Sequence, residues 1–335
     1  MPAAEKELSG ARAKMTGEAS RRQRPAEQDS SGVRFSIVIT SYNQRGFIKD
    51  GVESVLSQRQ SSKEVIVVDD GSQDGSLEVL KRYENSIRLL ALPANCGPME
   101  ARNRGAAAAR GEYLIFLDGD DLFPPWALDV YEQLITERRP TTIVSGPRWF
   151  EGAVPELRQD DAPKSVEFVE YESLLAMDRQ HAWLPGAFVV SRRAFRDVGG
   201  WSPEMFEADL ADLASKLQFS GKSILVCSPY TMLYRMHGAN ASSFVPPFLR
   251  GAHQMINREH AGLYPGRRRK RFERYALQAG CFSVVIRNAL HAGLHRAALQ
   301  LAVRGWSMIL AAIVRKSIIA LRGRRRVEVR QLETY

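Results

Sequence analysis

The sequence contains little cysteine. Its three cysteines, Cys96, Cys227 and Cys281, are far apart and odd in number. This usage excludes a disulfide framework and a cysteine-based zinc site, and it is typical of proteins in a reducing compartment. The chain must therefore be stabilised mainly by a hydrophobic core, and its 335 residues are enough to bury one.

Long apolar runs and glycine-rich phosphate loops are also absent from the sequence. No window of about 20 uninterrupted apolar residues predicts a transmembrane helix. Residues 1–33 lack the apolar centre of a secretory signal, and their small and mixed-charge residues predict a disordered lead. The motif GxxxxGK[ST] does not occur, and the segment "TSYNQRG" after the first expected strand is not G-x-G-x-x-G. A phosphorylated ligand would then be held by a metal ion and by separate basic groups such as Arg102.

Basic residues are concentrated near the C-terminus. Residues 266–330 contain 16 Lys and Arg against 2 Asp and Glu, whereas the rest of the chain has a net charge of −5. A basic segment of this kind attracts phosphate-rich surfaces, either anionic lipid or nucleic acid.

Short apolar runs alternate with segments of helical length from Phe35 onward. The expected strands are 35–40, 63–70, 87–93, 112–118 and 141–146, and the expected helices are 46–58, 75–83 and 98–109. Because the runs are too apolar for one-sided burial, they predict an α/β fold with a mostly parallel sheet flanked by helices. We expect one α/β domain over 34–244, with halves at 34–121 and 122–244, and a helical, basic region over 245–335.

Three carboxylates crowd the exit of the fourth expected strand. In "EYLIFLDGDDLF", Asp118, Asp120 and Asp121 follow four apolar residues directly. An acidic turn that caps the next helix is one interpretation. A calcium loop of the EF-hand type is excluded, because Leu122 and Phe123 stand where that loop needs a ligand and a glycine. The third interpretation is a Mg²⁺ or Mn²⁺ ion held by one or two carboxylates and by substrate phosphates.

Six segments together resemble the motifs of the family 2 glycosyltransferases. They are "VITSYNQ" at 38–44, "VVDDGSQDGS" at 67–76, "NCGPMEARNRG" at 95–105, "GEYLIFLDGDD" at 111–121, "PGAFVVSRRAFRDVGGW" at 185–201 and "YRMHGANAS" at 234–242. They follow the family's order and spacing over about 210 residues, and the resemblance implies an inverting enzyme with the GT-A fold.

The resemblance also implies roles for individual residues. The nucleobase and ribose would be held by Thr40, Tyr42 and Asp70. Nucleotide-sugar contacts are further implied for Arg102, Asp118 and Arg235, and the metal ligands would be Asp120, Asp118 and His237.

The catalytic base is the point at which the sequence departs from the family pattern. The family places a Glu-Asp pair at the start of the helix after the Gly-Gly-aromatic turn, and an ungapped match puts Asp209 and Leu210 there. Leucine cannot accept a proton. We therefore expect Asp209 to be the base, with Glu207 and Asp212 as alternatives, while the same acids in a merely helix-stabilising role remain a competing interpretation.

The segment 301–326 predicts an interfacial helix. On one continuous helix, Arg304, Arg315 and Arg322 would share one side, and Trp306, Ile309, Leu310 and Ile313 would share another. We expect a cytoplasmic protein attached peripherally to the inner face of the cell membrane. Packing of this region on the domain or on a second subunit is the alternative, and nucleic-acid binding is not expected because no reader motif accompanies the charge.

These observations predict an enzyme that uses a divalent cation, Mn²⁺ or Mg²⁺. It would move one sugar, with inversion, from a nucleotide-diphosphate sugar donor to a polysaccharide or lipid-linked acceptor. Two alternatives remain open, a non-catalytic GT-A-like scaffold and a sugar nucleotidyltransferase.

Overall fold

The computed structural model describes residues 32–178, 188–205, 208–238, 245–266 and 268–332. From Ser31 onward the chain forms one compact unit. The predicted disordered lead at 1–33 falls almost wholly outside the described residues, and so does Glu207.

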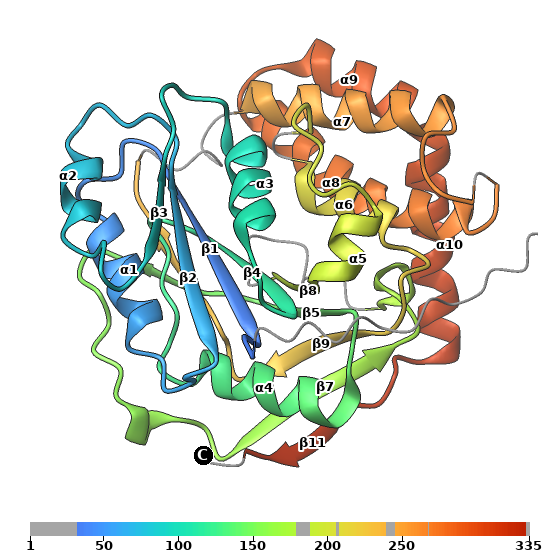
Figure 1. Cartoon of the computed structure of the whole chain (residues 1–335). Coiled ribbons are helices and arrows are strands. Elements are labelled where there is room, and N and C mark those ends of the chain that lie inside the picture. The colour runs from blue at the N-terminus through green and yellow to red at the C-terminus, as the bar shows by residue number, and fades with distance from the viewer. Residues whose placement is uncertain (1–31, 179–187, 206–207, 239–244, 267, 333–335) are drawn as a thin grey trace, which may run out of the picture. The chain divides into compact units, whose positions relative to one another are not determined.

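A nine-stranded sheet runs through the described part of this unit, in the order β11-β7-β9-β5-β8-β4-β1-β2-β3 (Figure 1). Its strands are β1 (Phe35–Ser41), β2 (Lys63–Asp69), β3 (Arg88–Ala91), β4 (Tyr113–Asp118), β5 (Thr142–Ser145), β7 (Ser165–Tyr171), β8 (Phe188–Ser191), β9 (Ser223–Ser228) and β11 (Glu328–Gln331). All of them except β7 and β8 run in the same direction. Strands β6 (Arg148–Glu151) and β10 (Leu233–Met236) pair in parallel as a small second sheet.

Helices cover both faces of the sheet. The helices are α1 (Ile48–Leu56), α2 (Ser76–Lys81), α3 (Pro98–Ala108), α4 (Ala127–Arg138), α5 (Arg192–Asp197), α6 (Asp209–Lys216), α7 (Val245–His260), α8 (Arg271–His291), α9 (His295–Arg304) and α10 (Trp306–Arg322). Successive side chains of β1 point to opposite faces of the sheet, and each face belongs to a different hydrophobic core. Ile37 and Ile39 belong to the core that contains residues of α1, α2 and α4, whereas Val38 belongs to the core that contains residues of α3 and of α5 to α8.

The α/β expectation is confirmed, and each of the five expected strands and three expected helices is present within a few residues of its predicted bounds. The helix expected after the Gly-Gly-aromatic turn is α6. Strands β6, β7 and β11 were not predicted.

The prediction of one continuous helix over 301–326 is wrong. The chain bends by 72° between α9 and α10, at Gly305. Arg315 is buried, and its guanidinium donates to the carbonyl oxygens of Leu175 and Met177 at 2.5 and 2.7 Å. Arg304 instead donates to Asn257 of α7, at 2.6 Å. The predicted basic stripe therefore does not exist.

Within the described residues, no single helix is long and apolar enough to cross a membrane. The bent pair of α9 and α10 reaches that length and composition only when the two helices are taken together.

Candidate active site

The predicted site residues gather where β1, β2 and β4 end. These three strands are parallel neighbours, so their carboxyl ends lie at one edge of the sheet. Thr40 is paired with Asp118 across β1 and β4, and Ser41 with Asp69 across β1 and β2. This edge is where open α/β sheets bind ligands.

The loops that follow β1 and β2 are held together by hydrogen bonds. Asn43 has a positive φ of 52°, and its side-chain oxygen accepts from the backbone N–H of Gln73 at 2.9 Å. The N–H of Asn43 donates to Ser72 Oγ, and that of Arg45 donates to Asp74 Oδ2. These bonds fix the loop from which Tyr42 projects, 47% exposed, at the edge of the site.

Asp70 is buried and organises the loop between β3 and α3. Its carboxylate accepts from the backbone N–H groups of Cys96 and Gly97 at 2.8 and 2.9 Å, and from the Cys96 thiol. Burial, together with Asp70, raises the pKa of Cys96 to about 11. The contact between Asp70 and a nucleobase remains a prediction.

Arg102 of α3 joins two of the predicted site carboxylates. Its Nη2 lies 2.7 Å from Asp118 Oδ1, and its Nη1 lies 2.7 Å from Asp209 Oδ2. Burial by itself would lower the pKa of Arg102, but the two carboxylates raise it above its ordinary value. The guanidinium is therefore a fixed positive charge that holds the end of β4 and the start of α6 together.

Two further contacts set the position of Arg102, and the sequence did not point to either. The side chain of Asn103 donates to the backbone oxygen of Trp201 and accepts from its N–H, both at 2.9 Å. The guanidinium carbon of Arg102 lies 5.4 Å from the centre of the Trp201 ring. Trp201 is buried in the core, so it supports the site from the protein interior.

Asp120 faces His237 at the other side of the carboxylate cluster. Their Oδ2 and Nε2 atoms are 2.9 Å apart, and the ring of Phe47 stacks on the imidazole with centroids 4.4 Å apart. Burial raises the pKa of Asp120, and the nearby charge of Asp118 adds to the increase. Burial and the same like charges raise the pKa of Asp121 well above its usual range. Burial and like charge therefore both disfavour full ionisation of these neighbouring carboxylates.

Arg235 is a buried neighbour of this cluster. Its Nη2 pairs with Asp50 of α1 at 2.7 Å, and its Nε donates to the backbone oxygen of Asp120. The ring centres of Phe47 and Phe150 each lie 5.1 Å from the guanidinium carbon of Arg235. In this structure Arg235 holds the Asp120 loop in place, and its predicted contact with phosphate remains a prediction.

The candidates for the base differ in their surroundings. Asp209 begins α6, is partly exposed, and borders Arg102. Asp212 is buried, and its oxygens accept from Ser202 and Tyr264 at 2.7 and 2.9 Å. Leu210 is partly buried and packs against the hydrophobic core. This geometry favours Asp209 over Asp212.

A metal ion would need ligands beyond those that the protein supplies. Among the described residues, no group of three or more His, Cys, Asp or Glu side chains is placed to hold an ion by itself. Asp120 and His237 nevertheless place a carboxylate oxygen and an imidazole nitrogen 2.9 Å apart, next to the carboxylates of Asp118 and Asp121. The residues fit a Mg²⁺ or Mn²⁺ ion that completes its coordination with substrate phosphates.

The family comparison agrees with this geometry. Residues 36–199, which include β1 to β5 and the Asp118–Asp121 cluster, match the model described as glycosyl transferase family 2. Residues 36–199 form a domain of that family. Asp209 and His237 lie beyond the matched segment of this glycosyltransferase domain.

Curated relatives of the glycosyltransferase domain are similar to it over short segments. A putative teichuronic acid biosynthesis glycosyltransferase, TuaG of Bacillus subtilis, is 39% identical over 106 residues, which is 31% of this chain and 42% of the relative. The poly-beta-1,6-N-acetyl-D-glucosamine synthase of Staphylococcus epidermidis is 25% identical over 195 residues, 55% of this chain and 45% of the relative. The chain thus covers less than half the length of either relative.

Solved structures share the fold over most of the chain. Residues 1–349 of TarS from S. aureus, crystallised with UDP, superpose with a TM-score of 0.54 at 16% identity, covering 88% of this chain and 93% of that one. The same protein with UDP-GlcNAc gives a TM-score of 0.54 at 15% identity, with 87% and 93% covered. These similarities show the GT-A fold.

Proposed function

We propose that this protein is an inverting glycosyltransferase. It transfers one sugar from a nucleoside diphosphate sugar to a hydroxyl of a polysaccharide or lipid-linked acceptor. One relative named as a teichuronic acid biosynthesis glycosyltransferase and another named as a poly-beta-1,6-N-acetyl-D-glucosamine synthase support this assignment of class. The TarS structures with UDP and UDP-GlcNAc support a uridine nucleotide as the first donor to test.

The observation that carries the proposal is the link from Asp118 through Arg102 to Asp209. The guanidinium of Arg102 contacts both Asp118, the first carboxylate of the cluster, and Asp209, the proposed base, each at 2.7 Å. Inversion in a single displacement needs a base close to the donor site, on the side of the anomeric carbon opposite the leaving diphosphate, and this link places Asp209 close to Asp118.

The residues of the chain then have separate tasks. Asp209 takes the proton of the acceptor hydroxyl as the new glycosidic bond forms and the bond to the diphosphate breaks. Arg102 orients that carboxylate and stays charged while it does so. Asp120 and His237, supported by Phe47, would hold the divalent cation together with the donor. When bound, the cation stabilises the negative charge that grows on the leaving diphosphate.

Asp209→Asn tests the proposal. Asparagine keeps a hydrogen-bond acceptor for Arg102 but cannot take the proton. We expect turnover of the nucleotide sugar to fall by about 10²–10⁴-fold, with UDP affinity unchanged. Turnover is measured as UDP release from a panel of nucleotide sugars, and UDP affinity by calorimetry.

Asp197→Asn is the matched control, because this acid is exposed on α5 and its partner Arg193 lies 3.9 Å away. The control should retain full turnover. If Asp209→Asn retains it too, the base is assigned wrongly. If the wild type binds UDP but transfers no sugar from any donor in the panel, the scaffold alternative holds.

A further inference from the structure

Helices α9 and α10 expose an unusual number of large apolar side chains. We call this set the apolar ridge: Leu299, Val303, Trp306, Leu310, Ile313, Val314 and Leu321. Leu321 is 88% exposed and Trp306 64%. Soluble monomers rarely present a contiguous apolar surface of this kind without a partner for it.

The same region has no acidic residue. Residues 274–327 contain ten Arg and Lys and no Asp or Glu. Arg315 is used in packing, but Arg287, Arg296, Lys316 and Arg322 are exposed. Among the described residues, none of these four forms an ion pair. The exposed side chains of this region thus include many apolar and basic residues, with no acidic residue among them.

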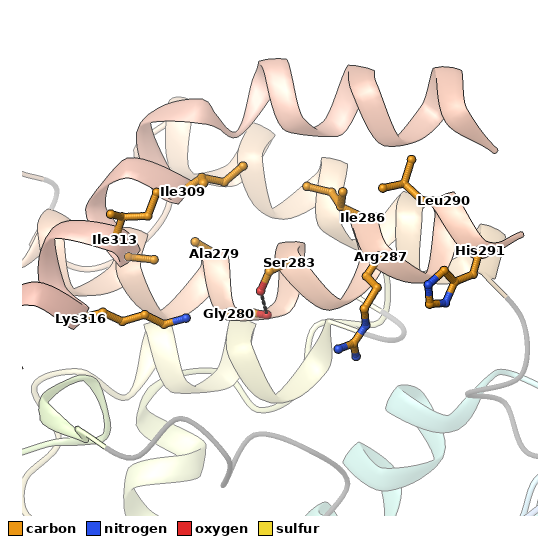
Figure 2. Close-up of a pocket in the computed structure, with 11 residues that line it drawn as sticks. Ala279, Gly280, Ser283, Ile286, Arg287, Leu290, His291, Ile309, Ile313 and Lys316 are labelled. Carbon is orange, nitrogen blue, oxygen red and sulfur yellow. Dashed lines mark hydrogen bonds between the residues drawn. The ribbon is translucent and has the colours of Figure 1, made fainter. Parts of the chain in front are cut away.

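A groove between α8 and α10 adjoins the ridge. Its volume is about 390 Å³, and small residues form part of its lining, among them Ala279, Gly280 and Ala312. A Cβ on Gly280 would meet nothing within 4 Å, so the groove is open there. In Figure 2, Lys316 and Arg287 lie along one side of the groove.

The other side of the groove is apolar. Ile309 of α10 and Ile286 and Leu290 of α8 line it in the same view (Figure 2). Ile313 belongs both to this lining and to the ridge, so the groove and the ridge are continuous.

We propose that this face docks on an anionic bilayer. The ridge enters the headgroup region, the groove takes a lipid acyl chain, and Arg287 and Lys316 meet the lipid phosphate. A bilayer with anionic lipids offers apolar interior and negative charge on one surface, as the inner face of a cell membrane does. An acidic protein partner would match the positive charge of this face but would supply no acyl chain for the groove. This docking does not depend on the sugar chemistry.

Vesicle flotation of the full chain tests the proposal. We expect recovery with vesicles that contain phosphatidylglycerol and little with pure phosphatidylcholine. Leu310→Ser with Ile313→Ser should reduce recovery by about tenfold or more, and so should Arg287→Glu with Lys316→Glu. Gly280→Leu, which fills the groove and leaves the ridge intact, should also reduce it.

Two exposed sites elsewhere provide matched controls. Leu263 lies between α7 and α8 and is 61% exposed, so Leu263→Ser controls for the loss of exposed apolar surface. Arg59 is exposed and lies before β2, so Arg59→Glu controls for charge reversal. Both should float like the wild type, and thermal melts of all variants check folding.

Three results would overturn the proposal. One is equal recovery on neutral and anionic vesicles, and another is full recovery of the folded ridge variant. The third is a wild-type protein that binds no vesicles and runs as a dimer in gel filtration, while the ridge variant runs as a monomer. A second copy of the chain would then cover the face.

Discussion

Asp209 and Asp212 lie three residues apart on α6 and face different surroundings. Asp209 borders the fixed charge of Arg102 at the edge of the site. Asp212 is 1% exposed, hydrogen-bonded to Ser202 and Tyr264, and near the buried amine of Lys216 at 3.7 Å. The two acids of α6 therefore divide into one available for chemistry and one used to hold the helix in place.

This division predicts different effects of the same substitution. Asp212→Asn removes the negative charge beside Lys216 and Arg258, so the free energy of unfolding should fall by about 1–3 kcal/mol. Chemical denaturation measures the loss. Sugar turnover by the folded variant should persist, whereas Asp209→Asn should lose turnover and keep its stability. The assignment fails if the two variants exchange these effects.

At the scale of single residues, the sequence pointed to groups with familiar chemistry and missed the groups that support them. Asp118, Asp120 and His237 were found from their motifs, and the structure brings Asp120 and His237 together. Asn103 and Asp50 gave no signal, because their roles depend on partners about 100 and 185 residues away. Only the fold reveals such contacts.

Among the elements, helix α3 shows how the site depends on close packing. Gly105 of α3 faces β1 and β2 so closely that a Cβ there would overlap Cγ1 of Val38 and lie 3.1 Å from Cγ2 of Val68. This approach brings α3, and with it Arg102, against the sheet.

Gly105→Ala should therefore lower the free energy of unfolding by about 1–3 kcal/mol, because the added methyl overpacks the core. Gly280→Ala is the matched control in another helix, since open space surrounds it. It should be neutral or stabilising by about 0.4–1 kcal/mol. Equal effects of the two substitutions, measured in urea, would contradict this account of α3.

The elements also show where sequence reasoning succeeds. Strands β1, β2 and β4 are buried on both faces, so each is a continuous apolar run that can be recognised without the fold. Strand β11 reads "EVRQ" and is largely exposed, and only its antiparallel pairing with β7 makes it a strand. The break at Gly305 was missed because the residues on either side favour helix, and tertiary packing decides where the helices part.

On the scale of the whole molecule, the C-terminal helices belong to the same core as the glycosyltransferase domain. Arg274 of α8 is fully buried and pairs with Glu259 of α7 at 2.7 Å, and its Nη1 donates to Gln218 after α6. Phe282 and Leu277 of α8 join the core that covers α3. The predicted start of a C-terminal region at 245 therefore marks a change of composition inside one compact unit. The outer surface of these helices is then left for the membrane docking that we propose.

The central claim is that Asp120 binds a divalent cation and, through it, the diphosphate of the donor. Calorimetric titration of UDP with and without Mn²⁺ tests this claim directly. The titration compares the wild type, Asp120→Asn and the control Asp160→Asn, because Asp160 is an exposed acid elsewhere. Mn²⁺ should strengthen UDP binding to the wild type and to Asp160→Asn, and Asp120→Asn should reduce that gain by about tenfold or more. An Asp120→Asn protein that keeps the full Mn²⁺-dependent gain and full sugar turnover would contradict the account.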